Sequence, residues 1–232
     1  MFIANLLLFA CLISFPEEGP VSDSLSRPEA FAPQELIAPG ALVSAGAVIA
    51  ISPCLHRNID IPVRDWAAGA REDSFLEIEN YIQYAPYAGY VVAGLMGAGD
   101  RGWAEHLLAA GTSAVFLTAL TRGIKYTVCR PRPEGGTHSF PSGHTATAFV
   151  GAELIRLEYG PWWGLGAYSL AVSTAALRVW HGRHWTSDVL AGAGIGILCA
   201  DMAYWLLPWE RKITMMPWSD GRSAGGIISF RF

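Results

Sequence analysis

The chain has 232 residues, of which 52% are hydrophobic and only 16% are charged, and its formal net charge is −4. An ordinary soluble domain carries about 25% charged residues, so this composition favours a membrane protein or an unusually apolar helical core. The net charge gives no argument for a nucleic-acid partner. The four cysteines are widely spaced and form no CxxC pair, so neither a zinc site nor a disulfide framework is expected.

The N-terminal segment differs in character from the rest of the chain. Residues 1–15 are almost all apolar, and a Pro-Glu-Glu-Gly-Pro sequence at 16–20 ends them abruptly. This pattern resembles the apolar part of a secretion signal, although the usual basic residues before it are missing. We therefore interpret residues 1–19 as a signal-like or anchoring leader, and residues 20–35, which are polar and rich in Pro and Ser, as a linker.

Long, nearly uncharged stretches rich in Ala, Gly and Leu then recur, and they are too long for buried strands. The six helices that they predict cover residues 36–52, 82–99, 107–121, 145–152, 162–177 and 189–207. The sequence thus predicts an all-α fold, a six-helix bundle at 36–208 integral to a membrane, followed by a polar tail at 209–232 with no assigned role. Several stretches fall short of the ~20 apolar residues of a spanning helix, so a soluble bundle remains an alternative.

Three glycines, Gly192, Gly194 and Gly196, lie inside the last predicted helix. A glycine-rich nucleotide loop would follow a strand, and no strand is predicted before them. We interpret them as small residues that let helices pack closely. At the end of the chain, residues 227–232 alternate in the manner of a short strand.

The scarce charged residues gather at particular helix ends. Consecutive antiparallel helices alternate in direction, so the end of the third, the start of the fourth, the end of the fifth and the start of the sixth share one side. The residues that this arrangement brings together are Lys125, Arg130, Arg132, Ser142, His144, Arg178, His184 and Asp188. Several cations beside two histidines and one carboxylate suit an anionic substrate.

The residue types at this end have a common chemical logic. Arg forks onto two phosphate oxygens, while Lys supplies a mobile point charge. Ser142 and Gly143 at a helix start offer backbone N–H groups and the positive end of the helix dipole to an anion. His184 and Asp188, spaced i, i+4, would share a helix face, so the carboxylate can hold one ring nitrogen and leave the other free to attack. Each feature alone is usually structural, but their coincidence on one side favours a site.

Together these residues resemble the type 2 phosphatidic-acid phosphatase superfamily, which includes lipid phosphatases, bacterial class A acid phosphatases and vanadium-dependent haloperoxidases. The family signature is K-x6-R-P, then P-S-G-H, then S-R-x5-H-x3-D. The positions matched here are Lys125, Arg132, Pro133, the complete Pro141-Ser142-Gly143-His144, Arg178, His184 and Asp188. The one departure is Leu177, where the family usually has Ser.

The resemblance implies a role for each matched residue. The residues expected to bind phosphate oxygens are Lys125, Arg132, Ser142, Gly143 and Arg178. His184 would attack phosphorus, Asp188 would orient it, and His144 would protonate the leaving oxygen and then activate water. No metal or other cofactor is expected, because three cations replace it electrostatically. Arg130 is not a motif position, and we expect it to supply a long-range positive field or to solvate its loop.

The predicted function is metal-independent hydrolysis of a lipid phosphomonoester or diphosphate through a phosphohistidine intermediate. Phosphatidic acid, phosphatidylglycerophosphate, undecaprenyl diphosphate and lipid A phosphate are the candidate substrates; besides this lipid and the membrane, neither nucleic acid nor an obligate protein partner is expected. Two alternatives remain: a soluble periplasmic acid phosphatase or haloperoxidase of the same fold, and a non-catalytic lipid-phosphate binder or small transporter.

We expect the chain in a bacterial inner membrane with the active site facing the periplasm. This orientation would place Arg101, Arg156 and the Arg211-Lys212 pair on the cytoplasmic side, as the positive-inside tendency prefers. If the leader crosses the membrane and all six helices span it, however, helix parity would place the site in the cytoplasm.

Overall fold

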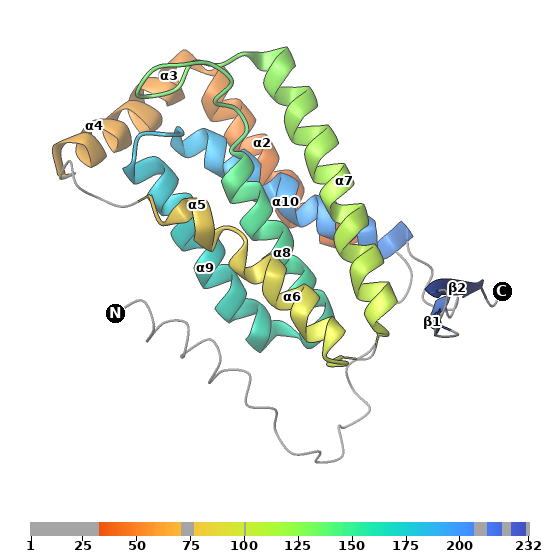
Figure 1. Cartoon of the computed structure of the whole chain (residues 1–232). Helices are drawn as coiled ribbons and strands as arrows, with labels where there is room; N and C mark the ends of the chain where they lie inside the picture. The colour runs from red at the N-terminus through yellow and green to blue at the C-terminus, as the bar shows by residue number, and fades with distance from the viewer. Residues whose placement is uncertain (1–32, 71–76, 100, 207–212, 220–223, 231–232) are drawn as a thin grey trace. The chain divides into compact units, whose positions relative to one another are not determined.

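Residues 33–70, 77–99, 101–206, 213–219 and 224–230 are described by a computed structural model (Figure 1). The predicted leader and most of the predicted linker lie outside the described residues. In chain order the elements are η1 (Pro33–Leu36), α2 (Ile37–Ile51), α3 (Pro53–Leu55), η2 (His56–Asp60), α4 (Ile61–Ala70), α5 (Glu79–Ile82), α6 (Ala85–Leu95), α7 (Trp103–Val128), α8 (Gly143–Tyr159), α9 (Pro161–Trp180), α10 (Thr186–Leu206), β1 (Ile213–Ser219) and β2 (Ala224–Phe230).

The predicted all-helical bundle is confirmed for the described residues between 33 and 206, and the six predicted helices correspond to α2, α6, α7, α8, α9 and α10. The largest difference in length is in α7, which was predicted over 107–121 and runs from Trp103 to Val128. The helix α8, which was predicted to end at 152, continues to Tyr159. Glu153 and Arg156 interrupt the apolar pattern without ending the helix, because Arg156 Nε donates to Glu153 Oε2 one turn away, at 2.8 Å.

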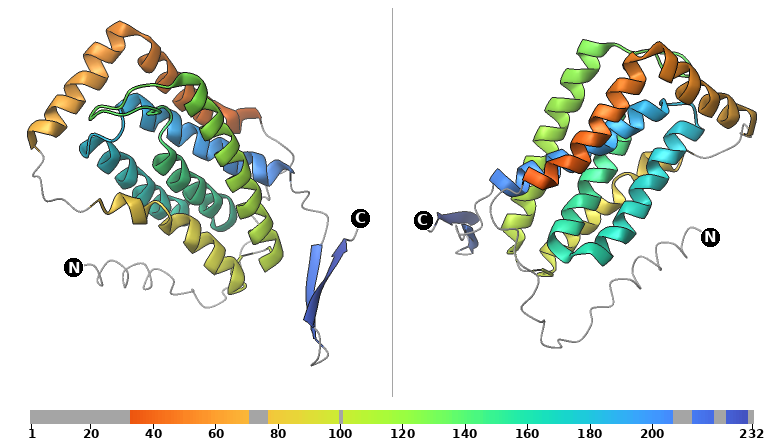
Figure 2. Two further views of the ribbon diagram at one scale, coloured as in Figure 1. Left: turned by 45° about the horizontal axis from the view of Figure 1, so that its top comes forward. Right: turned by 180° about the vertical axis from the view of Figure 1, so that it is seen from behind.

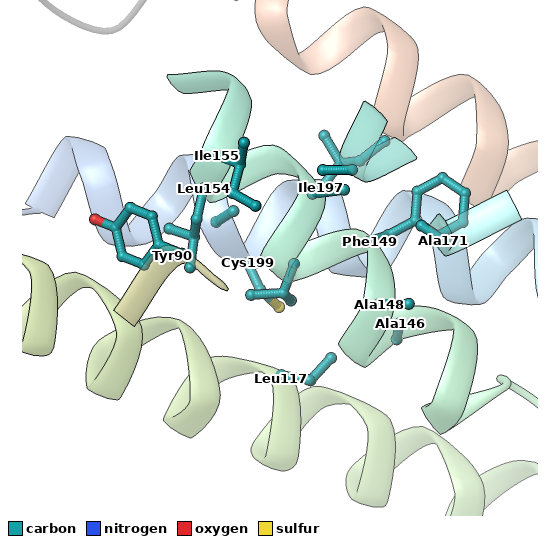
Figure 3. Packing of buried hydrophobic residues seen from close by; sticks show 14 of the residues in the cluster. Tyr90, Leu117, Ala146, Ala148, Phe149, Leu154, Ile155, Ala171, Ile197 and Cys199 are labelled. Carbon is teal, nitrogen blue, oxygen red and sulfur yellow. The ribbon is translucent and has the colours of Figure 1, made fainter. Parts of the chain in front are cut away.

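The centre of the bundle is α8, which packs against α6, α9 and α10 (Figure 1). Half of its ten buried residues are Ala, Gly or Thr, and Figure 3 shows Ala146 and Ala148 in the same buried cluster as the larger Phe149 and Leu154. Gly151 has no room for a side chain, since a Cβ there would lie 2.3 Å from the backbone nitrogen of Tyr87. Small residues therefore let the neighbouring helices approach α8 closely.

The three glycines of α10 confirm the predicted close packing. A Cβ on Gly192 would lie 2.6 Å from the carbonyl oxygen of Ser142, and one on Gly196 would lie 2.5 Å from that of Ala146. On the other side of α10, a Cβ on Gly194 would lie 2.5 Å from the carbonyl oxygen of Pro39 in α2, which crosses α10 in the right-hand view of Figure 2. The glycines thus set the distance between α10 and the start of α8.

Three helical segments are long and apolar enough to cross a membrane: Pro33–Ile51, Trp103–Val128 and Thr186–Leu206. Large apolar side chains on the first two are exposed, among them Ile51 and Val115. An exposed apolar surface of this kind suits contact with lipid. The chain is therefore a membrane protein.

The segment between the first two predicted helices is more ordered than its sequence suggested. Residues 55–80 showed no clear apolar period, but the structure forms α3, η2 and α4 over 53–70 and the short α5 at Glu79–Ile82. The five-residue element η2 (His56–Asp60) is a π-helical turn, and Asp60 at its end is buried. Turns of this type are frequent at functional sites.

The C-terminal segment contains a β-hairpin. The alternation at 227–232 predicted one short strand, and the structure pairs β1 with β2 in an antiparallel ladder that sets Ile213 opposite Phe230 and Ser219 opposite Ala224. This addition to the all-helical prediction was missed because β1 lacks a regular apolar alternation.

Candidate active site

Four segments at one end of the bundle carry the predicted site residues: the last turn of α7, the loop over 129–142 with the start of α8, the last turn of α9, and the loop into α10 (Figure 1). In chain order, they place Lys125, Arg132, Ser142, Gly143, His144, Arg178, His184 and Asp188 at this end. The antiparallel arrangement expected from the sequence therefore brings the sequence-distant motifs to one side.

Two backbone hydrogen bonds join these segments directly. The N–H of Ser142 donates to the carbonyl oxygen of Asp188 at 3.0 Å, and the N–H of His184 donates to that of Arg178 at 3.2 Å. The first bond fixes the start of α8 against the start of α10, and the second fixes the loop into α10 against the end of α9. The Pro-Ser-Gly-His and Arg/His/Asp motifs therefore form one rigid unit.

Ser142 is fully buried and caps α8. Its Oγ accepts a hydrogen bond from the hydroxyl of Thr145 at 2.9 Å and a long one, 3.5 Å, from the backbone N–H of the same residue. The Ser142 hydroxyl hydrogen is then available to an acceptor outside the helix. Together with the unpaired N–H groups of the first helical turn, which begins at Gly143, it offers donors to an anion.

His184 and Asp188 lie close together, but not in the way that the sequence predicted. The i, i+4 spacing suggested one helix face, whereas α10 begins at Thr186 and His184 precedes it. The backbone N–H of Trp185 donates to Asp188 Oδ2 at 2.9 Å, and this bond folds the loop back onto the helix start. His184 Nδ1 consequently lies 3.5 Å from Asp188 Oδ2, the outer limit of a hydrogen bond.

Ser139 completes the contact between these two residues. Its hydroxyl donates a short hydrogen bond to Asp188 Oδ2 and lies 3.5 Å from His184 Nδ1. The Nδ1 edge of His184 therefore faces both Ser139 and Asp188. No hydrogen bond holds the Nε2 atom of His184 among the residues that the structure describes, so this nitrogen is the one free to react.

The environment of His184 keeps its ring neutral. Burial lowers the pKa of His184 to about 4, although the neighbouring Asp188 raises it, while the positive charges of Lys125 and Arg178 lower it further. At neutral pH the ring is therefore uncharged and one nitrogen carries a lone pair. A neutral imidazole with an oriented Nδ1 edge is the form that can act as a nucleophile.

His144, in the first turn of α8, is likewise neutral. Burial lowers the pKa of His144 to about 4, and the nearby positive charges, first that of Arg178, lower it as well. Its Nε2 lies 3.0 Å from Asn80 Oδ1. An anion bound among these cations would offset their charge and raise the pKa of His144, so a bound phosphate would promote the protonation of this residue.

The three predicted phosphate ligands are incompletely paired. Lys125 Nζ donates to the carbonyl oxygen of His138 at 2.9 Å, and Arg132 Nε donates to that of Thr137 at 3.3 Å. Arg178 is buried, its Nη1 has only long contacts, and its Nε has no hydrogen-bond partner in the described part of the chain. A buried guanidinium with an unused N–H costs free energy unless an acceptor binds. The departure from the family pattern at Leu177 has not moved Arg178 away from the site.

The motifs did not reveal Glu79 and Asn80 in α5. Arg178 Nη1 lies 3.5 Å from Glu79 Oε1 and 3.3 Å from Asn80 Oδ1, and Nδ1 of His181 lies 2.7 Å from the same Glu79 oxygen. Asn80 Oδ1 thus contacts both Arg178 and His144. Both residues lie in the weakly patterned region 55–80, where a polar Glu-Asn pair gave no specific signal.

The expectation for Arg130 was wrong. It neither solvates the loop nor acts as a distant charge, because its side chain is only 10% exposed and contacts two buried carboxylates. Arg130 Nη1 donates to Asp188 Oδ1 at 2.7 Å, and Nη2 donates to Asp60 Oδ2 at 2.9 Å. The only feature of the sequence that could have indicated a structural role for Arg130 is the repeated Arg-Pro at 130–133.

Within the described ranges, no three His, Cys, Asp or Glu side chains are grouped so that they could hold a metal ion.

Comparison with known proteins tests the family resemblance. The sequence model of the PAP2 superfamily matches residues 106–212, a range that includes every motif position, and this match confirms the resemblance. A lipid A 1-phosphatase from Porphyromonas gingivalis is 34% identical over 157 residues, which cover 64% of this chain and 35% of that protein. The bacitracin transport permease protein BcrC of Bacillus licheniformis is 38% identical over 74 residues, covering 31% of this chain and 34% of BcrC. The chain thus spans about a third of the length of these curated relatives.

Two solved structures share the fold. The transmembrane PAP2-type phosphatidylglycerolphosphate phosphatase from Bacillus subtilis superposes with a TM-score of 0.58 at 21% identity, covering 73% of this chain and 95% of that one. LpxE of Aquifex aeolicus superposes with a TM-score of 0.51, also at 21% identity, covering 62% of this chain and 94% of that one.

Proposed function

We propose that this chain, which belongs to the PAP2 superfamily, is a metal-independent membrane phosphatase that removes phosphate from a lipid. The observation that carries the proposal is the convergence of the three motifs at one end of the bundle, around a neutral histidine and an arginine with an unused N–H. The three apolar helices add a membrane setting, in which a lipid phosphate would reach this end at the interface.

In the proposed reaction, Lys125, Arg132 and Arg178 bind the phosphate oxygens, joined by the Ser142 hydroxyl and the Gly143 N–H. These donors would stabilise the charge that develops on the oxygens in the transition state, which is the role a metal ion fills in other phosphatases. The carbonyl partners of Lys125 and Arg132 are neutral, so binding of phosphate to these cations would not break an ion pair.

The reaction would proceed in two steps. His184 Nε2 attacks phosphorus, the bond to the leaving oxygen breaks, and His144 donates its proton to that oxygen. Water then attacks the phosphohistidine while His144 accepts a proton from it, which releases inorganic phosphate and restores His184. Asp188 would orient His184 through the Nδ1 edge and stabilise the positive charge that the ring carries in the intermediate.

Among the candidate substrates, we favour the 1-phosphate of lipid A, because the relative with that activity is 34% identical over 64% of this chain. Phosphatidic acid, phosphatidylglycerophosphate and undecaprenyl diphosphate have the same chemistry at the phosphate and are the alternatives that the assay must include. The site residues recognise the phosphate, so the lipid would be selected by surrounding segments.

We also propose an inner-membrane location with the active site in the periplasm. Arg101 before α7 and Arg156 near the end of α8 lie at the opposite end of the bundle, which would then face the cytoplasm. Cys129 offers a direct test, because it is exposed in the loop of the active site. In a variant whose only exposed cysteine is Cys129, a membrane-impermeant maleimide should label intact spheroplasts. Labelling only after the membrane is opened would reverse the orientation.

The proposed function is tested with the purified full-length chain in detergent micelles that contain EDTA. We expect phosphate release from lipid A and slower release from a water-soluble phosphomonoester. Equal rates on the two would favour a soluble-type acid phosphatase, and binding of lipid A without release would favour a non-catalytic binder. Activity that is lost in EDTA and restored by a divalent metal would refute the metal-independent mechanism.

A further inference from the structure

A chain of buried charges lies directly behind the proposed nucleophile. Asp60, Arg130 and Asp188 form it, and we call these three residues the arginine bridge. Asp60 is 1% exposed and Asp188 is fully buried, while Arg130 lies between them with one guanidinium nitrogen on each carboxylate. The three residues come from η2, the 129–142 loop and α10, so the bridge joins parts of the chain that are far apart in sequence.

Asp60 anchors one end of the arginine bridge. Its Oδ1 accepts from the backbone N–H of Ser187 at 3.0 Å, and its Oδ2 accepts from the Ser187 hydroxyl at 2.7 Å. Burial disfavours the charged form of Asp60, but hydrogen bonds from Ser187, His56 and Arg130 outweigh it and lower its pKa. Asp60 is therefore a fixed anion tied to the residue that precedes Asp188.

Both terminal nitrogens of Arg130 have partners within or beside the bridge, so they are not available to bind a phosphate. Its Nη1 also donates to the Ser187 hydroxyl at 2.6 Å, and its Nη2 lies 3.0 Å from His56 Nδ1. The guanidinium lies over the ring of Trp185 at 5.5 Å, and the indole N–H of Trp185 donates to the carbonyl oxygen of Pro131 at 2.8 Å. Arg130 thus differs from Arg178, whose Nε has no partner in the described part of the chain.

The arginine bridge determines which oxygen of Asp188 faces the nucleophile. Arg130 holds Oδ1, so Oδ2 remains for the backbone N–H of Trp185, for the Ser139 hydroxyl and for Nδ1 of His184. Without Arg130, Asp60 and Asp188 would be two buried carboxylates on either side of Ser187 with no cation between them, and their repulsion would turn or protonate Asp188.

From this geometry, and resting on the proposed function, we infer that Arg130 is a positioning residue and that Asp60 anchors it. Arg130 does not bind the phosphate; it holds Asp188 in the orientation that aims His184 at phosphorus. Loss of the bridge should therefore slow the chemical step and leave the binding of the phosphate group almost unchanged.

The test is steady-state kinetics on lipid A in EDTA, with vanadate inhibition as a separate measure of phosphate binding. In Arg130→Lys, one charge remains but the two-carboxylate fork is lost, so kcat should fall by about tenfold to hundredfold, with KM and the vanadate inhibition constant within about threefold of wild type. In Arg130→Ala, kcat should be lower still, and added guanidinium should restore part of it. Arg122→Gln, an exposed arginine on α7, is the matched control and should keep wild-type kinetics.

Asp60→Asn is nearly isosteric, so it should fold, and it provides a second test of the inference if an Arg130 variant cannot be purified. It should lower kcat by severalfold, and its effect should not add to that of Arg130→Lys, because both act through one unit. Unchanged kcat in Arg130→Lys and Asp60→Asn would overturn the inference. So would a weakened vanadate affinity with kcat preserved, since that result would make Arg130 a phosphate ligand. An inactive wild type would instead refute the proposed function, and the inference with it.

Discussion

The two ends of the helical bundle both bury charge, but the buried charges at the two ends have different partners. At the end away from the motifs, Arg101 Nε lies 3.3 Å from Glu158 Oε2, and the guanidinium lies 3.6 Å over the ring of Tyr204. His106 is held through both ring nitrogens, by a backbone carbonyl and by the Tyr159 hydroxyl, each at 3.1 Å. In this distal cluster of Arg101, His106, Glu158 and Tyr204, the buried arginine is paired with a carboxylate of the protein itself, and the contacts tie α7, α8 and α10 together.

At the motif end, by contrast, the partners of Lys125 and Arg132 are backbone carbonyls, and Arg178 has only long contacts. His184 keeps one ring nitrogen free of hydrogen bonds to the described residues. The comparison teaches that buried charge alone does not mark a site. What marks it is a group of cations in which Lys125 and Arg132 have only neutral carbonyl partners and Arg178 has only a long contact with a carboxylate.

The largest expected difference between the two ends is in their histidines. His184→Ala removes the proposed nucleophile, so turnover and the acid-labile phosphoenzyme should fall below detection. His106→Gln, in the distal cluster, should keep near-wild-type kcat per folded molecule while it lowers the thermal midpoint, because it disturbs only packing and hydrogen bonds. Radiolabelled lipid phosphate, quenched in alkali, measures the intermediate directly. Wild-type turnover in His184→Ala would remove this residue from the mechanism.

The second comparison is between two arginines. Arg178→Lys keeps a charge but cannot fork onto two oxygens, and losing one charge-assisted hydrogen bond of about 1.5–3 kcal/mol predicts a tenfold to hundredfold loss of kcat/KM. Arg156→Lys, whose partner is Glu153 away from the motifs, should leave kcat/KM within about twofold of wild type. A stable Arg178→Lys enzyme with unchanged kcat/KM would show that Arg178 only anchors the end of α9.

A third, smaller effect should come from the helix contact beneath the site. A Cβ at Gly192 would lie 2.6 Å from the Ser142 carbonyl oxygen, so Gly192→Ala must push the start of α8 away from α10. Overpacking of this kind costs about 1–3 kcal/mol of stability, and the displaced Ser142 and Gly143 donors should lower kcat/KM by severalfold. Gly166→Ala in α9 meets nothing within 4 Å and is the matched control. Equal kinetics in both variants would show that the α8 start tolerates movement.

The sequence predicted the helices and the motif end of the bundle because both depend on local patterns. Apolar stretches mark helices regardless of their partners, and antiparallel helices bring alternate ends together. The arginine bridge could not be predicted in this way, because its contacts join residues far apart in the chain, such as Asp60 and Ser187. The region 55–80 has no apolar period that would place Asp60 or Glu79 on a buried face. Arg130 was misread for the same reason, since its two carboxylate partners lie in other elements.

The last expected effect is the dependence of stability on pH. In the folded chain burial lowers the pKa of both His144 and His184 to about 4, below the ordinary value of 6.5 that the unfolded chain would have. Between these two values the unfolded state binds more protons than the folded state, so the free energy of unfolding is greatest above pH 6.5 and declines as the pH falls towards 4. The thermal midpoint in one detergent should therefore decrease from pH 7.5 through 6 to 5.

His144→Asn removes one of the two titrating groups, so its midpoint should fall less steeply over the same range. Vanadate should flatten the decline in the wild type, because an anion among the cations makes protonation of His144 less costly in the folded state. If wild type and His144→Asn show the same slope with pH, His144 does not titrate in the cationic surroundings described for the motif end.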